Sequence, residues 1–404
     1  MLETQPVSGN TTHTQPENRA FYPALDGVRA VAFLLVYFWH YLYLPWGWTG
    51  VDIFFVLSGF LITGILFDSR NDVHRVRNFY VRRTLRIFPL FYGVFLALLL
   101  LQPVFHWLWS WTWLVWPAYL GNLVVFTQPL VQGSAVQRLA DAMLYPAQSH
   151  PWAPIFIGHF WSLCVEEQFY LLWPWVVFWV YDRVKLTYIC AVAIPIVLIA
   201  RIMANRLLPD WMIANNVLGH ATPFRMDALL LGGLLALLLR GPYAEALLRW
   251  SRWVGRVALP LLLLWLLATR SHFSQKFLAK ANFPGVETVG FSVIAALAGL
   301  IILLAIQTDS WTYTVLRTSP LRWMGRITYG AYVFHDVFHQ SYNAFADYLC
   351  VESPIRGSIP DVLNMHRSLI VVPLGLVTTF GLAWLSFRFF ESPFLNLKER
   401  WTIR

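Results

Sequence analysis

The chain contains few charged residues. Only 13% of its 404 residues are Asp, Glu, Lys or Arg, whereas 58% are hydrophobic and the mean hydropathy is +0.54. A soluble domain carries about twice that charged fraction, roughly 25%. Apolar runs of roughly 20 residues, which are long enough to cross a bilayer as helices, recur along the sequence. The composition therefore excludes an ordinary soluble domain and predicts an all-α, polytopic membrane protein.

Cysteine is also scarce, and the three residues are scattered at Cys164, Cys190 and Cys350. Their spacing suits neither a disulfide framework nor a zinc site, and the histidines do not accompany cysteines or carboxylates at metal-ligand spacing. We therefore predict no metal. The first 20 residues are polar and lack the apolar core of a signal peptide, so we expect the first apolar segment to remain as a helix.

Acidic residues are outnumbered by basic ones, 21 against 30, which gives a net charge of +9. Such an excess can indicate nucleic-acid binding. Here, however, the basic residues fall between apolar segments and do not form a stripe interleaved with aromatics. They follow the rule that cytoplasmic loops of membrane proteins are positively charged. We therefore expect no nucleic-acid partner, and we expect both termini in the cytoplasm.

About ten membrane spans are expected from the apolar segments. Residues 111–131 are apolar and rich in Trp, but a span there would place the later basic clusters outside. We interpret 111–158 as an outer re-entrant segment and loop. The expected domains are a polar cytoplasmic tail (1–20), a membrane domain (21–395) and a short basic cytoplasmic tail (396–404). The expected spans are residues 23–44, 49–67, 88–105, 159–181, 186–204, 223–239, 257–270, 287–306, 327–349 and 367–388.

Arg29 and His40 are the most informative polar residues of the first span. Ten residues separate them, so on a helix both side chains lie on one face, roughly 16 Å apart along the axis. A cation and a titratable base are costly inside a membrane and indicate function by default. The alternatives are a snorkelling arginine that sets topology and a core histidine bonded to a backbone carbonyl.

Two expected spans open with carboxylates on the outer side. Asp52 follows a short outer turn, so it should lie at a depth similar to that of His40 and could orient the imidazole. It could equally be a charge that favours the helix dipole. Glu166 and Glu167 are adjacent and cannot share a helix face, so at most one of them faces His40. Ser162 could simply cap that helix.

Arginines cluster before the third span. Arg83 and Arg86 are three residues apart, so on a helix they point the same way, and guanidinium groups suit phosphate oxygens. The spacing alone is equally typical of a cytoplasmic anchor. His335 and Asp336 lie well inside the ninth expected span, which again suggests a polar cavity.

These residues belong to motifs that occur in a fixed order. The motifs are Arg-x10-His (29–40), Gly-Val-Asp-Ile-Phe-Phe-Val-Leu-Ser-Gly-Phe-Leu-Ile (50–62), Arg-x-x-Arg with Ile-Phe-Pro (83–89), Trp-Ser-Leu-x-Val-Glu-Glu-Gln-Phe-Tyr (161–170), Ile-Thr-Tyr-Gly-Ala-Tyr-Val-Phe-His (327–335) and Phe-Phe-Glu-Ser-Pro-Phe (389–394). With them the sequence resembles membrane-bound acyltransferase family 3, the glycan O-acetylase family. The resemblance runs from about residue 22 to 395.

The resemblance implies an O-acyltransferase in a bacterial inner or cytoplasmic membrane. It implies acyl-CoA, in the first instance acetyl-CoA, as the donor, and a glycan or glycoside acceptor on the far side. Some family members carry a C-terminal soluble domain, for which this chain leaves no room, so a single module is expected. The acceptor, the acyl length and the oligomeric state stay open, and membrane lipids are the other expected partners.

The resemblance also assigns roles to residues. Arg83 and Arg86, with Arg29, would bind the CoA phosphates, and His40 would act as the general base. Asp52 or Glu166 would orient His40 or contact the sugar, and an acyl-histidine intermediate is a variant. Asp336 is not carried over from the family. A substrate-binding or structural role falls to Ser58, Trp161, Tyr329 and His335.

Other functions fit intramembrane His, Asp and Arg residues. A proton-coupled transporter is the main alternative, although the sequence shows no internal repeat and no paired Gly/Pro-broken spans. An acyl-CoA-sensing or purely structural membrane protein is another. An acyltransferase acting on a small-molecule glycoside or a lipid is a third.

Overall fold

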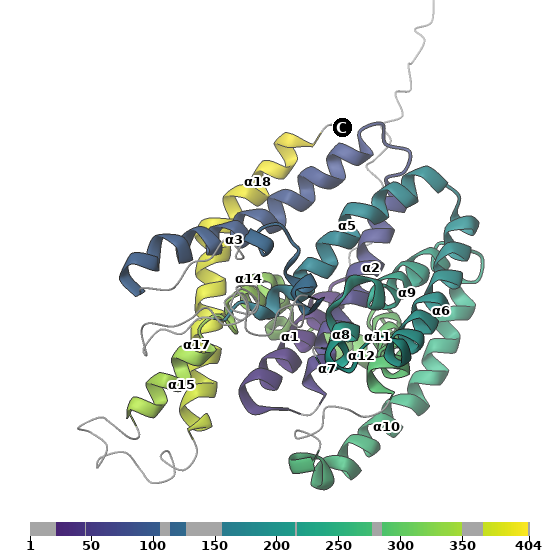
Figure 1. The fold of residues 1–404 in the computed structure, drawn as a ribbon. Coiled ribbons are helices and arrows are strands. Elements are labelled where there is room, and N and C mark those ends of the chain that lie inside the picture. Colours follow the sequence, from purple (N-terminus) through teal and green to yellow (C-terminus); the bar gives the residue numbers. More distant parts are fainter. Residues whose placement is uncertain are drawn as a thin grey trace, which may run out of the picture.

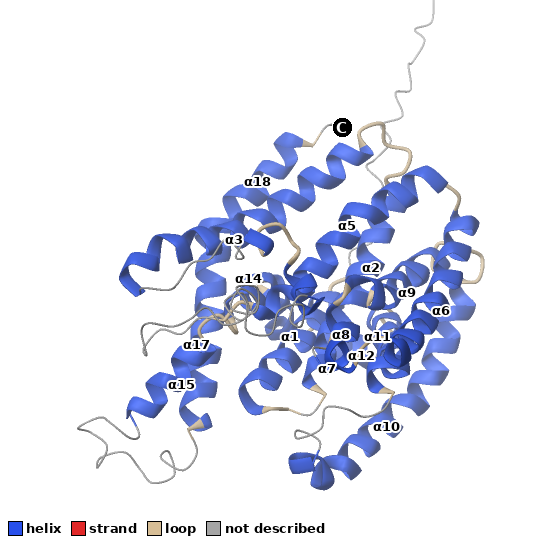
Figure 2. Ribbon diagram, viewed as in Figure 1, coloured by secondary structure: helices blue, strands red, loops and turns tan. Residues whose placement is uncertain are grey.

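The computed structural model describes residues 22–44, 46–105, 114–126, 156–214, 216–276, 285–349 and 367–402. Within these ranges the chain forms helices and loops and no strand, which confirms the all-α prediction (Figures 1 and 2). The elements in chain order are α1 (Ala24–Leu42), η1 (Gly47–Thr49), α2 (Gly50–Asp68), α3 (Arg75–Phe105), η3 (Gly121–Phe126), η4 (Gly158–Phe160), α5 (Trp161–Val180), α6 (Arg183–Leu207), α7 (Asp210–Ala214), α8 (Val217–His220), η5 (Thr222–Phe224), α9 (Met226–Leu238), α10 (Ala244–Lys276), η6 (Val286–Gly290), α11 (Phe291–Ala305), α12 (Trp311–Leu316), α13 (Ser319–Arg326), α14 (Thr328–Phe334), α15 (His339–Asp347), α17 (Ser368–Leu385), η9 (Ser386–Glu391) and α18 (Ser392–Trp401).

Six helical stretches of the described chain are long and apolar enough to cross a membrane. A helix needs about 20 apolar residues for this, because each residue adds only about 1.5 Å. The protein is therefore a polytopic helical membrane protein, as predicted. The six stretches are Ala24–Leu42, Gly47–Asp68, Arg75–Val104, Arg183–Leu207, Glu287–Ala305 and Ser368–Trp401.

Helices α2 and α9 pack against each other in the interior, and α1, α5, α6 and α11 lie around them (Figure 1). The α2–α9 contact depends on glycine. A Cβ on Gly59 would lie 1.8 Å from the carbonyl oxygen of Leu229, and a Cβ on Gly232 would lie 2.0 Å from that of Val56. Small residues let two helix backbones approach closely where lipid supplies no hydrophobic drive for association. This close packing fixes the position of α2, which carries Ser58.

Two expected spans extend further than hydropathy indicates. The basic segment before residue 88 continues the third span as helix, so α3 has 31 residues and includes Arg83 and Arg86. Likewise the expected seventh span, 257–270, is part of the 33-residue helix α10. Charged residues at these helix ends lower the local hydropathy without breaking the backbone hydrogen bonds. The arginines of α3 are consequently held on a rigid element.

The expected ninth span, 327–349, is broken. Helix α14 ends at Phe334, α15 begins at His339, and residues 335–338 form turns between them. Distant groups satisfy carbonyls of the break: the Tyr41 hydroxyl donates to the His335 oxygen at 2.7 Å, and the backbone N–H of Phe156 donates to the Val337 oxygen at 3.1 Å. Irregular backbone is tolerated at membrane depth when protein covers it in this way. The break presents His335 and Asp336 to the neighbouring helices.

Several predictions concern residues outside the described ranges. The 1–20 tail and most of the 111–158 segment are among them. Of the latter, residues 114–126 are described and include the 3-10 helix η3, and 156–158 lead into η4. The outer re-entrant placement and both cytoplasmic tails stay predictions.

Candidate active site

Arg29 and His40 lie near opposite ends of α1. The Arg29 guanidinium donates to Asp26 in the first turn at 2.7 Å, and about a quarter of each of the Arg29 and His40 side chains is exposed. A carboxylate in the first turn also favours the helix dipole. Since α1 is an uninterrupted helix, the two side chains share a face as the spacing predicted. Helix geometry keeps them apart, so each belongs to a different part of the site.

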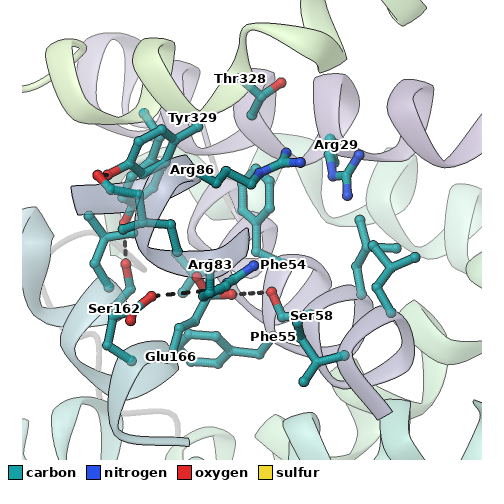
Figure 3. Close-up of a pocket in the computed structure, with 18 of the residues that line it drawn as sticks. Arg29, Phe54, Phe55, Ser58, Arg83, Arg86, Ser162, Glu166, Thr328 and Tyr329 are labelled. Carbon is teal, nitrogen blue, oxygen red and sulfur yellow. Dashed lines mark hydrogen bonds and ion pairs between the residues drawn. The ribbon is translucent and has the colours of Figure 1, made fainter. Parts of the chain in front are cut away.

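A cavity of about 250 Å³ lies between α1, α2, α3, α5 and α14. Each of these helices contributes a polar side chain, and between the polar groups the wall is apolar. In Figure 3 Arg86 extends toward Arg29, whereas Arg83 lies with Glu166 and Ser58. Among the predicted site residues, those that line the cavity are Arg29, Ser58, Arg83, Arg86, Glu166 and Tyr329.

The positive charges of this cavity are unequally compensated. Arg83 stacks on the ring of Tyr170, with its guanidinium carbon 3.6 Å from the ring centroid, and its Nε is 3.9 Å from Glu167. Glu166 accepts a hydrogen bond from Ser58. Arg86 makes no ion pair with any described residue. Arg86 lines the cavity and is an exposed residue. An accessible guanidinium without a counter-ion is suited to an anionic ligand, and its fork matches phosphate oxygens.

His40 faces Asp336 in the break between α14 and α15. His40 Nδ1 lies 3.2 Å from Asp336 Oδ2, and the Asp336 side chain is only 3% exposed. A buried carboxylate at one imidazole nitrogen fixes the ring and supports positive charge on it, which leaves the other nitrogen to exchange protons. The pair has the arrangement of a general base with its orienting carboxylate.

Three more imidazoles surround Asp336. The rings of His159 and His335 have centroids 4.9 Å apart, and the His335 ring meets His40 edge-on at 5.2 Å. His159 Nδ1 is 3.8 Å from Asp336 Oδ2, and His339 Nδ1 is 3.4 Å from Oδ1. His40, His335 and Asp336 each offer one ligand atom within 4.8 Å of the others, so this group could hold a metal ion. The sequence did not reveal it, because His40 is distant along the chain.

Tyr332 separates the cavity from the imidazoles. It lines the cavity together with Ser162. Its hydroxyl is 2.5 Å from the Ser162 oxygen and donates to the His159 carbonyl at 3.1 Å, while its ring centroid lies 5.2 Å from that of His335. The arginine-lined cavity and the His40–Asp336 pair are therefore adjacent parts of one site, with one tyrosine between them.

Two predicted residues lie elsewhere. Asp52 is fully buried and pairs with Arg225 at 2.6 Å, and Arg225 stacks on Phe291 at 3.8 Å. Trp161 packs edge-on against His220. The expectation that Asp52 or Glu166 orients His40 therefore does not hold in this geometry: Asp52 neutralises an arginine, and Glu166 lies in the cavity. The carboxylate at His40 is Asp336.

Sequence reasoning underrated Asp336 and missed His159, Tyr332 and Arg225. The only local signal for Asp336 was its position beside His335 in an apolar stretch, which marks a costly intramembrane charge. His159 lies in η4, just before α5, at the first residue of the fourth expected span, and nothing in its local sequence indicated a contact with Asp336. No spacing rule connects these residues, because each comes from a different element.

The acyltransferase domain model of acyltransferase family 3 matches residues 22–388 of this chain. The chain belongs to this family. Its relatives include the peptidoglycan O-acetyltransferase OatA of Listeria monocytogenes (28% identity, 93% of this chain and 56% of the relative), the putative peptidoglycan O-acetyltransferase YrhL of Bacillus subtilis (28%, 93% and 55%) and the O-acetyltransferase OatA of Staphylococcus aureus (26%, 92% and 57%). No solved structure matches it.

This family membership confirms the resemblance given by the motifs, and the apolar helices make the chain a membrane member of this family. The chain spans about half the length of the curated relatives that it matches.

Proposed function

We propose that the protein is an integral membrane O-acyltransferase. In this proposal it moves an acyl group, in the first instance acetyl, from cytoplasmic acyl-CoA to a hydroxyl of an extracytoplasmic carbohydrate. The observation that carries the proposal is the contact of 3.2 Å between His40 Nδ1 and Asp336 Oδ2 beside a cavity lined by three arginines. Peptidoglycan is the first acceptor to test, because two of the relatives are named for it.

The arginine-lined cavity would take the donor. Arg86, which has no counter-ion among the described residues, would meet a CoA phosphate with Arg83 and Arg29. About 16 Å of helix separates Arg29 from His40, a distance that a pantetheine arm can cover. The thioester would then lie near Tyr332, at the end of the cavity closest to the imidazoles.

His40 would act on the acceptor. Its Nε2 takes the proton of the sugar hydroxyl while Asp336 stabilises the resulting imidazolium. The freed oxygen attacks the thioester carbonyl carbon, and the tetrahedral intermediate collapses with cleavage of the C–S bond. The CoA thiolate then receives the proton, so that the imidazole returns to its neutral form. In the variant pathway His40 itself accepts the acyl group before the sugar does.

The membrane orientation forms part of the proposal. Both termini would lie in the cytoplasm, with about ten spans between them, because most Lys and Arg residues fall in loops that this topology makes cytoplasmic. The Arg29 end of α1 would then face the donor side and the His40 end the acceptor side. The membrane would be the bacterial inner or cytoplasmic membrane.

Transfer measured in proteoliposomes tests the proposal. Purified full-length protein is reconstituted, acetyl-CoA is supplied on one side and glycan fragments on the other, and both acetylated glycan and free CoA thiol are quantified. We expect product only when donor and acceptor are on opposite sides, and at least about a hundredfold less of it with His40→Gln. Small glycosides and lipids are included as alternative acceptors.

A transporter would give a different result. It would move a solute or protons across the vesicle without consuming the thioester. Free CoA thiol that does not rise above the protein-free control with any acceptor would therefore contradict the proposed function.

A further inference from the structure

We propose that His40, His335 and Asp336 form a binding site for a divalent transition-metal ion of the Zn²⁺ type. The first observation is proximity: the three residues each bring one ligand atom within 4.8 Å of the others. They reach this place from α1 and from the break between α14 and α15, so the tertiary structure alone brings them together.

The second observation is that buried polar atoms of this cluster have no hydrogen-bond partner within the described part of the chain. They are His335 Nε2, Asp336 Oδ2 and the neighbouring His159 Nδ1. Asp336 Oδ2 makes no hydrogen bond of acceptable angle even though His40 Nδ1 is 3.2 Å away. His335 is fully buried and Asp336 is 2% exposed. Buried polar atoms without a partner cost about 1–3 kcal/mol each and call for an explanation.

The third observation concerns the tautomers. His335 Nδ1 lies 2.7 Å from the Tyr332 carbonyl, and His159 Nε2 lies 3.2 Å from the Val333 carbonyl. A carbonyl accepts only, so each of these nitrogens carries a hydrogen. In the neutral ring the other nitrogen, His335 Nε2 or His159 Nδ1, is then a bare lone pair in the cluster around the Asp336 carboxylate.

Lone pairs that converge beside a carboxylate repel one another and attract a cation. Metal-binding histidines almost always donate their second N–H to a carbonyl or carboxylate, as His335 does here. Imidazole nitrogen together with carboxylate oxygen selects Zn²⁺ and its neighbours over Mg²⁺ or Ca²⁺, which prefer oxygen alone.

The distances need a modest adjustment. Ligands at about 2.0–2.1 Å from one Zn²⁺ stand roughly 3.3 Å apart in a tetrahedron, so the widest pair must close by up to about 1.5 Å. His40 can contribute to this adjustment, because it is partly exposed and lies two residues before the end of α1. The ion would replace the proton on His40 Nδ1, so binding would release a proton.

One consequence rests on the proposed function. An ion on His40 Nδ1 separates this nitrogen from Asp336 and withdraws electron density from the ring, so Nε2 becomes a weaker base. Zn²⁺ should therefore inhibit acyl transfer over the concentration range in which it binds.

Equilibrium dialysis with Zn²⁺ alone tests the site. The full-length protein, free of any polyhistidine tag and stripped with a chelator, is dialysed in detergent, and bound zinc is measured by mass spectrometry. We expect one ion per chain, unaffected by excess Mg²⁺, and an affinity at least about tenfold weaker in His335→Gln and Asp336→Asn. Because these two residues are buried, His40→Gln serves as a second variant at a partly exposed position.

The matched control is His220→Gln. Like His335, His220 has its Nδ1 close to a backbone carbonyl, that of Asn216 at 2.9 Å. Its ring packs against Trp161, and it is not one of the three residues of the proposed metal site. Its substitution should leave zinc binding unchanged. Zinc binding that is absent, or that all four variants retain, would overturn the proposed site while leaving the proposed function untouched. Binding at this site without inhibition would support the metal site and contradict the role of His40 as base.

Discussion

Two buried clusters of charged and titratable groups differ in how completely their hydrogen bonds are satisfied. In the first, Arg201 forms a two-pronged contact with Asp227 at 2.8 and 3.0 Å, and its remaining donors reach Ser292 and the carbonyls of Phe224 and Thr288 at 2.6–2.8 Å. In the second, around Asp336, several buried nitrogen and oxygen atoms have no partner among the described residues. Complete satisfaction is typical of a structural ion pair, whereas buried groups without a partner call for an explanation, such as a catalytic role or a bound water or ion.

The comparison changes how intramembrane charges are interpreted here. By sequence alone Arg201, Asp227, His40 and Asp336 are equally costly residues in apolar segments. The structure separates them into a pair that holds α6 to α9 and a cluster that is available for chemistry. Asp52 also neutralises a buried arginine, Arg225, but this pair is less completely satisfied, because Asp52 Oδ2 and Arg225 Nε and Nη1 have no hydrogen-bond partner among the described residues.

His40→Gln should give the largest effect. Glutamine keeps a donor near Asp336 but cannot take a proton, so we expect kcat to fall about 10²–10⁴-fold with an unchanged unfolding profile. Initial rates of CoA release with a glycan acceptor measure this. His74→Gln, in the loop between α2 and α3, is the control and should retain the wild-type rate. A kcat of His40→Gln within tenfold of the wild-type value would contradict a catalytic role for the cluster around Asp336.

Arg201→Met should be the most damaging change to stability. It leaves the Asp227 charge buried without its partner, which costs about 3–5 kcal/mol. We expect a matching loss in the free energy of unfolding, measured by denaturant titration in detergent. Adding Asp227→Leu to Arg201→Met should restore most of that loss, since both charges are then gone. A single variant as stable as wild type would show that complete hydrogen bonding does not identify structural charges.

Asp336→Asn should have an intermediate effect on catalysis. The amide preserves size but no longer stabilises an imidazolium, so we expect kcat to fall on the order of 10²-fold. The KM for acyl-CoA should change little, because the arginines lie on the other side of Tyr332. Steady-state kinetics that vary donor and acceptor separately distinguish these effects. A change confined to KM would instead place Asp336 in donor binding.

Arg86→Gln should give the smallest effect and should act on the donor alone. Loss of one charge-assisted contact to a phosphate costs about 1.5–3 kcal/mol, which corresponds to a KM for acyl-CoA raised by roughly ten- to a hundredfold. The kcat measured at saturating acyl-CoA should stay at the wild-type value. Arg249→Gln, on the exposed surface of α10, is the matched control. An equal effect in both variants would indicate loss of general positive charge and not loss of a donor site.

Much of the site was predictable because helix geometry is local. The spacing of Arg29 and His40 placed them on one face, and the spacing of Arg83 and Arg86 made them point the same way, whatever the rest of the protein does. In the structure Arg29, Arg83 and Arg86 line one cavity and His40 lies near the far end of α1. Within the cavity, however, Arg86 extends toward Arg29 whereas Arg83 lies with Glu166 and Ser58 (Figure 3). The composition likewise predicted an all-helical membrane protein.

The partner of His40 was not predictable in this way. Asp52 was the natural candidate, because a short turn joins the first two spans, yet a helix can rotate such a residue to another neighbour, here Arg225. Asp336 reaches His40 only because the ninth expected span breaks at residues 335–338 and distant groups such as Tyr41 satisfy its backbone.

The helical character of the chain, the helix faces that carry its polar residues and, through the ordered motifs, its family all follow from the sequence. Hydropathy and the 3.6-residue period are properties of each segment, so they need no knowledge of its neighbours. Which faces meet does not follow from the sequence. It depends on close packing, such as the α2–α9 glycine contact, and on where a broken helix finds hydrogen-bond partners. Local rules therefore place Arg29 and His40 on one helix, whereas the packing of distant segments brings the Asp336 carboxylate to His40.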